Sequence, residues 1–317
     1  MSTSEQDIIP VQSIGVPKPL VDGPEKTTGK AMFAADFQSI EALVGRILRS
    51  PHAHANIIRI DTSKAEALPG VKAVVTEADC SDSYGVLPIA MNEWALARGR
   101  VRYRGEPVAA VAAINVATAQ AALDLIEVTY EELPAYFTAA DARADDALDL
   151  HQEKPGNIER EVDFDLGDVD QGMAAADLIR EVDVRCAEVC QVQMEPHAAY
   201  AEYDPGRERL TIRPSTQVPF YVHKMLSRTM GMADSHIRVI KPHIGGGFGS
   251  RTETLQSDLI AGLLARKARG TVRVVLSREE TFITHRGRPE SHIKMKVGMK
   301  ADGTITATDF SVVQRGG

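Results

Sequence analysis

Short apolar stretches alternate with segments of helical spacing over the first 133 residues. Pro107 to Ile114 is continuously apolar, which is typical of a strand buried on both faces. The pattern predicts strands at 43–48, 56–60, 71–75, 107–114 and 126–130, and helices at 61–68 and 117–125. Strands interleaved with helices over this length indicate an α+β or α/β unit of ordinary domain size.

Residues 134–160 have no apolar period and contain four aspartates that we expect to lie in solvent. A second run of periodic segments follows. Its strongest signal is the amphipathic helix expected at 254–266, with Leu259 and Leu263 on the apolar face of the helix. The other expected elements are helices at 169–176 and 220–230, strands at 178–184, 198–203, 209–213 and 272–276, and a hairpin at 292–310 that turns at Asp302-Gly303.

These patterns divide the chain into four parts. Residues 1–20 carry three prolines and no periodicity, so we expect an extended arm. A first domain is predicted at 21–138, a linker at 139–160 and a second domain at 161–317. The chain closes on a strand that runs into Gly316-Gly317, so we expect the second domain to be truncated at its C-terminal end.

The composition narrows the classes of partner and the location. The 317 residues include 44% hydrophobic and 25% charged residues, as in a globular protein. A net charge of −8 argues against nucleic acid or an acidic membrane surface as the main partner. There is no apolar run of about 18 residues and no leader-like start, so a cytoplasmic location is expected.

Cysteine usage points to a reduced compartment. The three cysteines, Cys80, Cys186 and Cys190, form no close CxxC pair. An iron–sulfur cluster takes about four thiolates, so this chain cannot hold one by itself. Cys186 and Cys190 lie in a valine-rich segment, and we expect them to fill core space rather than bind metal.

The densest chemical signal is a glycine-rich segment between a predicted strand and a predicted helix. It reads Gly245-Gly-Gly-Phe-Gly249 after Ile237 to Ile240. Such a segment can present backbone N–H groups to an anionic or oxygen-rich ligand. It can equally be a turn that lets a helix pack closely on a strand, and its residues alone leave both readings open.

The spacing of the glycines excludes several nucleotide motifs. Ser250 or Thr252 stands where the dinucleotide fingerprint needs a closing glycine or alanine. Gly29-Lys30 is followed by Ala31, so a Walker loop is absent. No nucleophile elbow surrounds Ser250. A nicotinamide enzyme, an ATPase and a serine hydrolase are therefore disfavoured.

A few polar side chains are candidates for chemistry elsewhere. Gln217 lies between a strand and a helix, where its amide could face an oxygen ligand. Glu195 and His197 could form an acid/base pair, although we favour Glu195 as an acceptor for backbone amides. His243, two residues before the glycines, is the histidine best placed to meet a ligand, but a lone histidine is more often structural. His52, His54 and His223 are expected to be structural.

Taken together, several motifs in order resemble the molybdenum-binding subunit of the xanthine oxidase family. Ser215-Thr-Gln217 is followed at about thirty residues by the Gly-Gly-Gly-Phe-Gly segment, and Glu195-Pro-His-Ala is similar to the family as well. The earlier matching stretches are Val21 to Gly29, Ser50-Pro-His-Ala-His-Ala55 and Tyr103 to Ala110. The resemblance covers about Val21 to the last residue.

Details favour one branch of that family, the α subunit of 4-hydroxybenzoyl-CoA reductase. The similar stretches are 43–51, 217–223, 245–253 and 278–289. The purine-oxidising relatives carry Lys-Glu after their glycine run, and that glutamate contacts the purine. Here those positions are Arg251 and Thr252, with Glu253 displaced by one, which disfavours a purine substrate.

The resemblance implies an α+β fold, with an α/β hammerhead domain followed by the first molybdopterin-binding domain. It implies a molybdenum–molybdopterin cofactor, in the cytosine dinucleotide form, with the metal held by the pterin dithiolene and by no side chain. By motif position, Gln217 would donate a hydrogen bond to an oxo ligand. Gly246, Gly247, Phe248 and Gly249 would line the metal.

Family subunits are more than twice as long as this chain. Their C-terminal half supplies most pterin contacts and the glutamate that acts as base, so no catalytic residue is expected on this part. The implied partners are an iron–sulfur subunit and an FAD subunit, with ferredoxin as electron donor and an aromatic acyl-CoA as substrate. Two alternatives are a xanthine dehydrogenase-like hydroxylase of an aldehyde or N-heteroarene, and a non-catalytic scaffold.

Overall fold

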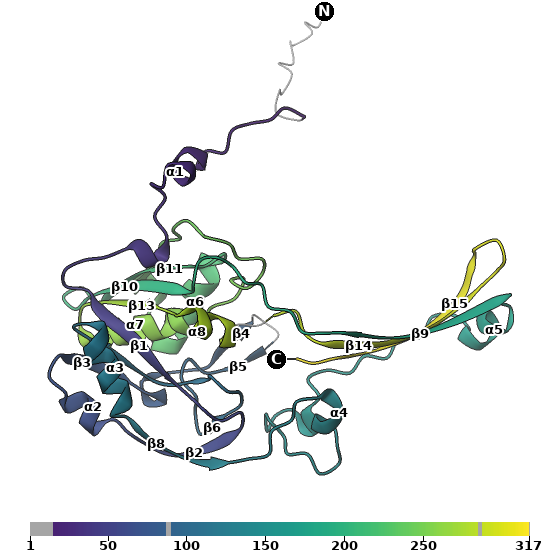
Figure 1. The fold of residues 1–317 in the computed structure, drawn as a ribbon, viewed down its shortest axis with the longest axis horizontal. Helices are drawn as coiled ribbons and strands as arrows, with labels where there is room; N and C mark the ends of the chain where they lie inside the picture. Colours follow the sequence, from purple (N-terminus) through teal and green to yellow (C-terminus); the bar gives the residue numbers. More distant parts are fainter. Residues whose placement is uncertain (1–14, 87–89, 285–286, 317) are drawn as a thin grey trace, which may run out of the picture.

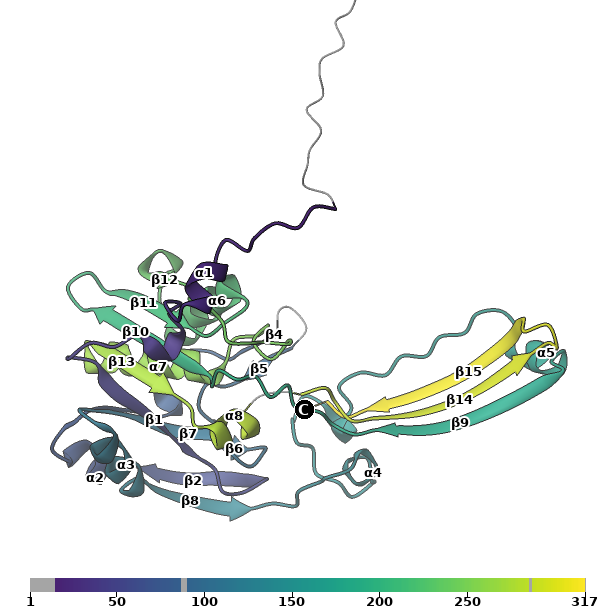
Figure 2. The ribbon, with the colours of Figure 1, turned by 45° about the horizontal axis from the view of Figure 1, so that its top comes forward.

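A globular body carries two projections, an N-terminal segment and a long three-stranded ribbon (Figures 1 and 2). The computed structural model describes residues 15–86, 90–284 and 287–316. Of the predicted N-terminal arm, residues 1–14 lie outside the described residues. Residues 15–20 are exposed and form no helix or strand, after which the short helix α1 (Gly23–Thr27) begins.

The body is organised around one seven-stranded sheet to which both predicted domains contribute strands. From one edge to the other, the sheet runs β12 (Ile237–Val239), β11 (Arg209–Pro214), β10 (Ala198–Asp204), β13 (Thr271–Val275), β1 (Leu43–Arg49), β7 (Pro107–Ala113) and β3 (Val71–Val75). The two halves join where β1 and β13 pair in parallel, with Leu43 opposite Val272. The sheet is therefore a single structural unit across the predicted 139–160 boundary, and the domain limits stay a prediction.

Strand β7 shows why this sequence forms a central strand. All seven of its residues are buried, and those from Ala109 to Ala113 alternate between two cores. Ala110 and Ala112 face the cluster built on α7 (Gln256–Ala268), whereas Ala109 and Val111 face α3 (Val116–Asp124) on the other side. Small side chains on both faces let helices approach from both sides, so the strand needs no polar positions.

Helix α7 begins two residues later than its hydrophobic period predicts. Leu255 has an extended backbone, and the Asp258 carboxylate accepts a hydrogen bond from its N–H at 3.3 Å. This cap fixes the first helical residue at Gln256. The helix then buries every residue from Ser257 to Ala265, because the sheet covers one side and α6 (Pro219–Met230) packs on another.

A smaller sheet and several short elements complete the body. The sheet has the order β6 (Arg100–Val101), β2 (Ala55–Asp61), β8 (Glu127–Glu132). The hairpin β4 (Tyr84–Val86) and β5 (Ala90–Glu93) and strand β6 were not predicted, because two to four residues are too few to show a period. The remaining short helices are α2 (Ser63–Ala67), α4 (Ala139–Ala142), α8 (Arg278–Ile283), η1 (Ala34–Asp36), η2 (Glu77–Asp79), η3 (Pro155–Asn157) and η4 (Asp234–His236).

The ribbon is formed by β9 (Leu178–Cys186), β14 (Ser291–Met299) and β15 (Ile305–Gln314), with β14 in the centre. Helix α5 (Val169–Ala174) lies at its far end (Figure 2). The predicted hairpin is confirmed, with Gly303 at φ 91° in the turn. The prediction that Cys186 fills core space is wrong, because the cysteine ends an exposed strand, and Cys190 is half-buried.

Candidate functional site

The glycine segment forms an irregular loop between β12 and α7. Gly246 and Gly249 have φ angles of 103° and 92°, which glycine adopts without steric cost. Phe248 has φ 51° and a side chain that is 74% exposed. A left-handed backbone and an exposed aromatic ring both carry a free-energy cost in a non-glycine residue, and such outliers concentrate at binding sites.

The backbone donors of this loop are largely unused. Gly245 donates its N–H to the Glu195 carboxylate at 2.8 Å. Within the described part of the chain, none of the next four N–H groups, at Gly246, Gly247, Phe248 and Gly249, donates a hydrogen bond. Because backbone N–H groups in folded proteins are almost always paired, four successive free donors indicate a surface suited to an oxygen-rich group.

Gln217, which lies just before the first residue of α6, is next to this loop. Its backbone N–H donates to the carbonyl of Arg251 at 2.9 Å. Its side chain lies against Gly247 so closely that a Cβ built there would be 2.3 Å from the Gln217 Oε1. The exposed amide of Gln217 makes no side-chain hydrogen bond to any described residue. The fold thus brings together Gln217 and the glycine segment, as the sequence predicted.

A buried ion pair holds the loop from behind. Arg251 is fully buried, and its Nη1 donates to the Glu195 Oε2 that also accepts from Gly245. Its Nη2 donates to the carbonyls of Glu195 and Pro196, the latter at 3.3 Å. The prediction that Glu195 accepts from backbone amides is confirmed. The importance of Arg251 was missed, since an arginine after a glycine run carries no signal of burial.

Asp258 adds a second buried carboxyl beneath the loop. Burial raises its pKa from 3.8 to about 7, while the Leu255 N–H and the charge of Arg251 act in the opposite direction. Buried polar atoms without a partner among the described residues include Gln193 Oε1, Glu195 Oε1 and Arg251 Nε. Buried polar atoms without a partner are uncommon in folded proteins, and here they cluster beneath the loop.

Replacing Asp258 by asparagine should stabilise the chain, by an amount that grows as the pH rises from 3.8 to about 7. In this window the unfolded carboxyl ionises while the folded one keeps its proton, so the unchanged chain loses stability by at most about 1.4 kcal/mol per pH unit. Urea unfolding of both proteins across this range measures the difference.

The matched control is Asp302→Asn. The Thr304 N–H lowers the pKa of this exposed carboxyl, so its contribution is present above pH 3.8 and is lost only as the pH falls. The difference in free energy of unfolding between Asp302→Asn and the unchanged chain should therefore stay constant over the same pH range. A flat difference for Asp258→Asn as well would show that its carboxyl titrates normally in the folded chain.

Three of the histidines considered in the sequence, His54, His223 and His243, have partners within the chain. His243 Nε2 lies 3.1 Å from Glu25 Oε2, so it ties the loop to α1 rather than facing a ligand. His54 Nδ1 lies 2.6 Å from the Pro134 carbonyl, and His223 Nε2 lies 3.0 Å from that of Asp234. Among the residues that the structure describes, no three His, Cys, Asp or Glu side chains form a group that could hold a metal ion.

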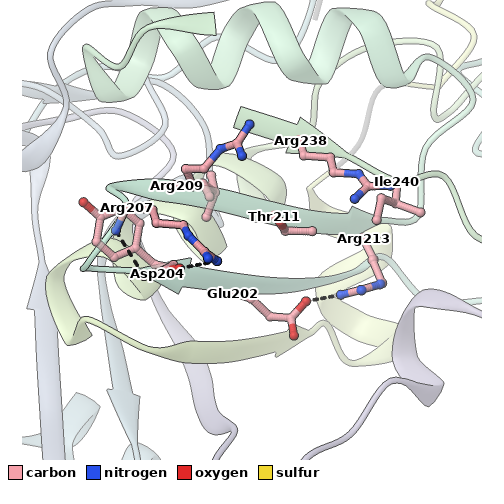
Figure 3. A pocket seen from close by; sticks show the side chains of 10 residues that line it. Glu202, Asp204, Arg207, Arg209, Thr211, Arg213, Arg238 and Ile240 are labelled. Atoms are coloured by element: carbon pink, nitrogen blue, oxygen red, sulfur yellow. Dashed lines mark hydrogen bonds and ion pairs between the residues drawn. The ribbon is translucent and has the colours of Figure 1, made fainter. Parts of the chain in front are cut away.

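A separate cleft of about 430 Å³ lies on the open face of β10, β11 and β12 (Figure 3). Its lining includes four arginines, of which Arg213 pairs with Glu202 and Arg207 lies 3.6 Å from Asp204. Neither Gln217 nor the glycine segment reaches it. Because its acidic side chains already pair with two of the arginines, the cleft is a partly neutralised charge network on the sheet surface.

Fold and loop together define a cofactor-binding α/β protein in which the chain supplies hydrogen-bond donors instead of metal ligands. The donor set fits a cofactor that carries its own metal and oxygen groups. Sequence comparison agrees with this class. A family described as the aldehyde oxidase and xanthine dehydrogenase a/b hammerhead domain matches residues 28–134, and the molybdopterin cofactor-binding domain matches residues 150–317.

The chain therefore belongs to the xanthine oxidase family of molybdopterin-binding oxidoreductases. It is 32% identical to a probable hypoxanthine oxidase of Escherichia coli K12, over 94% of this chain and 35% of that protein. It is also 32% identical to the nicotinate dehydrogenase large molybdopterin subunit of Eubacterium barkeri, over 95% of this chain and 70% of that one.

Solved structures confirm the predicted fold class. Quinoline 2-oxidoreductase from Pseudomonas putida 86 superposes with a TM-score of 0.86 at 29% identity, over 93% of this chain and 38% of that one. The chain thus spans little more than a third of several of the proteins that it matches. No helix in the described ranges is both long and apolar enough to cross a membrane.

Proposed function

We propose that this chain supplies one wall of the molybdenum site in a multisubunit hydroxylase that adds water-derived oxygen to an N-heteroarene or an aldehyde. The observation that carries the proposal is the Gln217 amide beside four unused N–H groups of the glycine loop. In this proposal Gln217 would donate a hydrogen bond to an oxygen of the bound cofactor, and Gly246, Gly247, Phe248 and Gly249 would line the cofactor's metal. The bound cofactor supplies the redox chemistry.

This chain's own part is to position and stabilise. Donors that are fixed before the reaction stabilise developing negative charge without reorganisation, which makes them effective in a dry site. The Arg251–Glu195 pair fixes the Gly245 end of the loop, and Ser250 Oγ donates to the Gly247 carbonyl at 2.8 Å at its other end. The loop is therefore held by side chains that do not themselves face the ligand.

The residues that follow the glycines bear on the substrate. Arg251 is fully buried, and Thr252 Oγ1 donates to the Gly249 carbonyl at 2.8 Å. Neither residue offers the carboxylate that contacts the purine in purine-oxidising relatives. Nicotinate dehydrogenase and quinoline 2-oxidoreductase, by their names, act on other N-heteroarenes. A pyridine-type heteroarene is therefore our preferred substrate.

The second candidate is reductive dehydroxylation of 4-hydroxybenzoyl-CoA with electrons from ferredoxin. The stretches 217–223 and 278–289, and the missing carboxylate at 252, favour it. None of the relatives named above is such a reductase. For both candidates we propose electron transfer through iron–sulfur and FAD subunits, a cofactor in the cytosine dinucleotide form and a cytoplasmic location.

Substrate assays on the purified complex separate the candidates. Oxidation of nicotinate, quinoline or an aldehyde with an artificial electron acceptor supports the hydroxylase. Reduction of 4-hydroxybenzoyl-CoA with a low-potential donor, without such oxidation, supports the reductase. A stable complex whose subunits contain no molybdenum by elemental analysis supports a scaffold and overturns both.

Replacing Gln217 by alanine in the assembled complex should lower kcat by about 10²-fold and leave KM nearly unchanged, because a preorganised donor is lost. Steady-state kinetics and molybdenum content per subunit measure the effect. Gln120→Ala is the matched control, since Gln120 lies on the exposed side of α3 and its side-chain amide donates to Asp124. Equal kinetics for the two variants would remove Gln217 from the site.

A further inference from the structure

The ribbon of β9, β14 and β15 has two chemically different faces. In an antiparallel sheet, directly opposed residues point to the same side. Val184, Ile293 and Val312 form one cross-strand row, and Val182, Met295 and Phe310 form the next. The row after these contains Arg180, Val297 and Thr308, so the uncharged stretch ends there. We call the surface formed by the first two rows, six residues in all, the apolar face.

The opposite face is charged and internally paired. Its rows contain Asp183 opposite Lys294, and Glu181 opposite Lys296. Lys296 Nζ lies 3.2 Å from the Glu181 carboxylate, and His292 Nε2 lies 2.6 Å from that of Asp183. This face therefore forms two ion pairs within the ribbon and is suited to water.

Helix α5 packs on the charged side and leaves the apolar face open. A Cβ on Gly298, which shares the side of Lys294 and Lys296, would be 3.2 Å from the Met173 sulfur. On the apolar face Phe310 is 60% exposed and Val182 is 43% exposed. None of the three core clusters of the described chain includes a ribbon residue. A single sheet layer without a cover lacks the core that stable sheets need.

We propose that the apolar face is the docking surface for an apolar layer contributed by the rest of the molybdenum subunit. The Escherichia coli relative aligns over 35% of its length and the Eubacterium barkeri relative over 70%, so both carry polypeptide beyond the part that matches this chain. The six side chains carry no charge, so they match a layer of aliphatic and aromatic residues. A membrane surface is disfavoured because, among the paired rows of the ribbon, a single cation, Arg180, lies on this side, whereas Lys294 and Lys296 point to the opposite side.

The apolar face is connected to the glycine loop through the end of the ribbon nearest the globular body. Strand β9 ends at Cys186, nine residues before Glu195, which accepts from Gly245. At this end of the ribbon Arg315 pairs with Glu188, and Val189 and Arg288 exchange backbone hydrogen bonds at 3.1 and 2.8 Å. Covering the apolar face would therefore brace the strand that leads to the loop anchor.

The test compares Phe310→Glu with Ser311→Glu in the complex that contains the whole molybdenum subunit. These neighbours on β15 point to opposite faces, and Ser311 lies opposite Lys294 on the charged side. The yield of assembled complex by size-exclusion chromatography should fall at least tenfold for Phe310→Glu, because a charge is buried in an apolar interface. Ser311→Glu should stay within twofold. Equal yields for the two variants overturn the proposal.

Two further measurements on the 317-residue chain test whether the apolar face binds a second copy of the chain or a lipid surface instead. If the chain alone forms a dimer that Phe310→Glu dissociates, the face binds a second copy and the proposal is wrong. If the chain binds anionic lipid vesicles and Phe310→Glu abolishes this binding, the proposal is likewise wrong. The thermal transition of the body should be the same in both variants, which excludes misfolding as the cause. These readouts do not depend on activity, so they stand or fall separately from the proposed function.

Discussion

Replacing Arg251 by methionine is expected to lower the free energy of unfolding by about 3–5 kcal/mol, because it leaves a buried carboxylate without its cation. The side chains of Arg251 and Glu195 are 0% and 7% exposed. The carbonyls of Glu195 and Pro196 also lose their donor. Urea unfolding followed by circular dichroism measures the loss, and the loop that contains Gly245 should exchange its amide hydrogens faster.

An exposed ion pair provides the control for this substitution. Arg228 and Asp82 lie 2.8 Å apart with side chains 41% and 47% exposed. Removing Arg228 should cost no more than about 1 kcal/mol, because water screens such a pair. Similar small losses for Arg251→Met and Arg228→Met would mean that the buried pair does not hold the loop.

Replacing Gly247 by alanine is expected to lower kcat of the assembled enzyme by about 10²-fold, through displacement of Gln217. The new Cβ would lie 2.3 Å from the Gln217 Oε1 and 2.6 Å from its Cδ, which is closer than any real contact. The backbone of Gly247 is outside the left-handed region, so alanine adds no strain there. Gln217 is exposed and can rotate away, so stability should change little.

A control variant and a double variant test whether Gly247→Ala acts through Gln217. Gly270→Ala should be silent, since its nearest neighbour would be 3.9 Å away. The double variant Gly247→Ala with Gln217→Ala should be no slower than Gln217→Ala alone, because both changes remove the same donor. Additive losses of kcat would mean that Gly247 acts by a route other than Gln217.

The sequence alone determined most of the elements and proposed the residues of the candidate site. Periodicity located β1, β7, β10 and α7 because apolar side chains must face a core at fixed intervals. The turn at Asp302-Gly303 followed from local backbone chemistry. Gln217 and the glycine segment were predicted from their motif. These features are local, or are carried by a few residues in order.

Tertiary structure alone decided how these parts meet. The parallel pairing of β1 with β13 joins residues more than two hundred positions apart, and no periodicity specifies it. The burial of Arg251 depends on Glu195, and the open side of the ribbon depends on the register of β9, β14 and β15. Contacts between distant segments are set by packing and charge pairing in three dimensions. The sequence therefore proposed the donors of the candidate site, and the fold determined which of them make no hydrogen bond within the described chain.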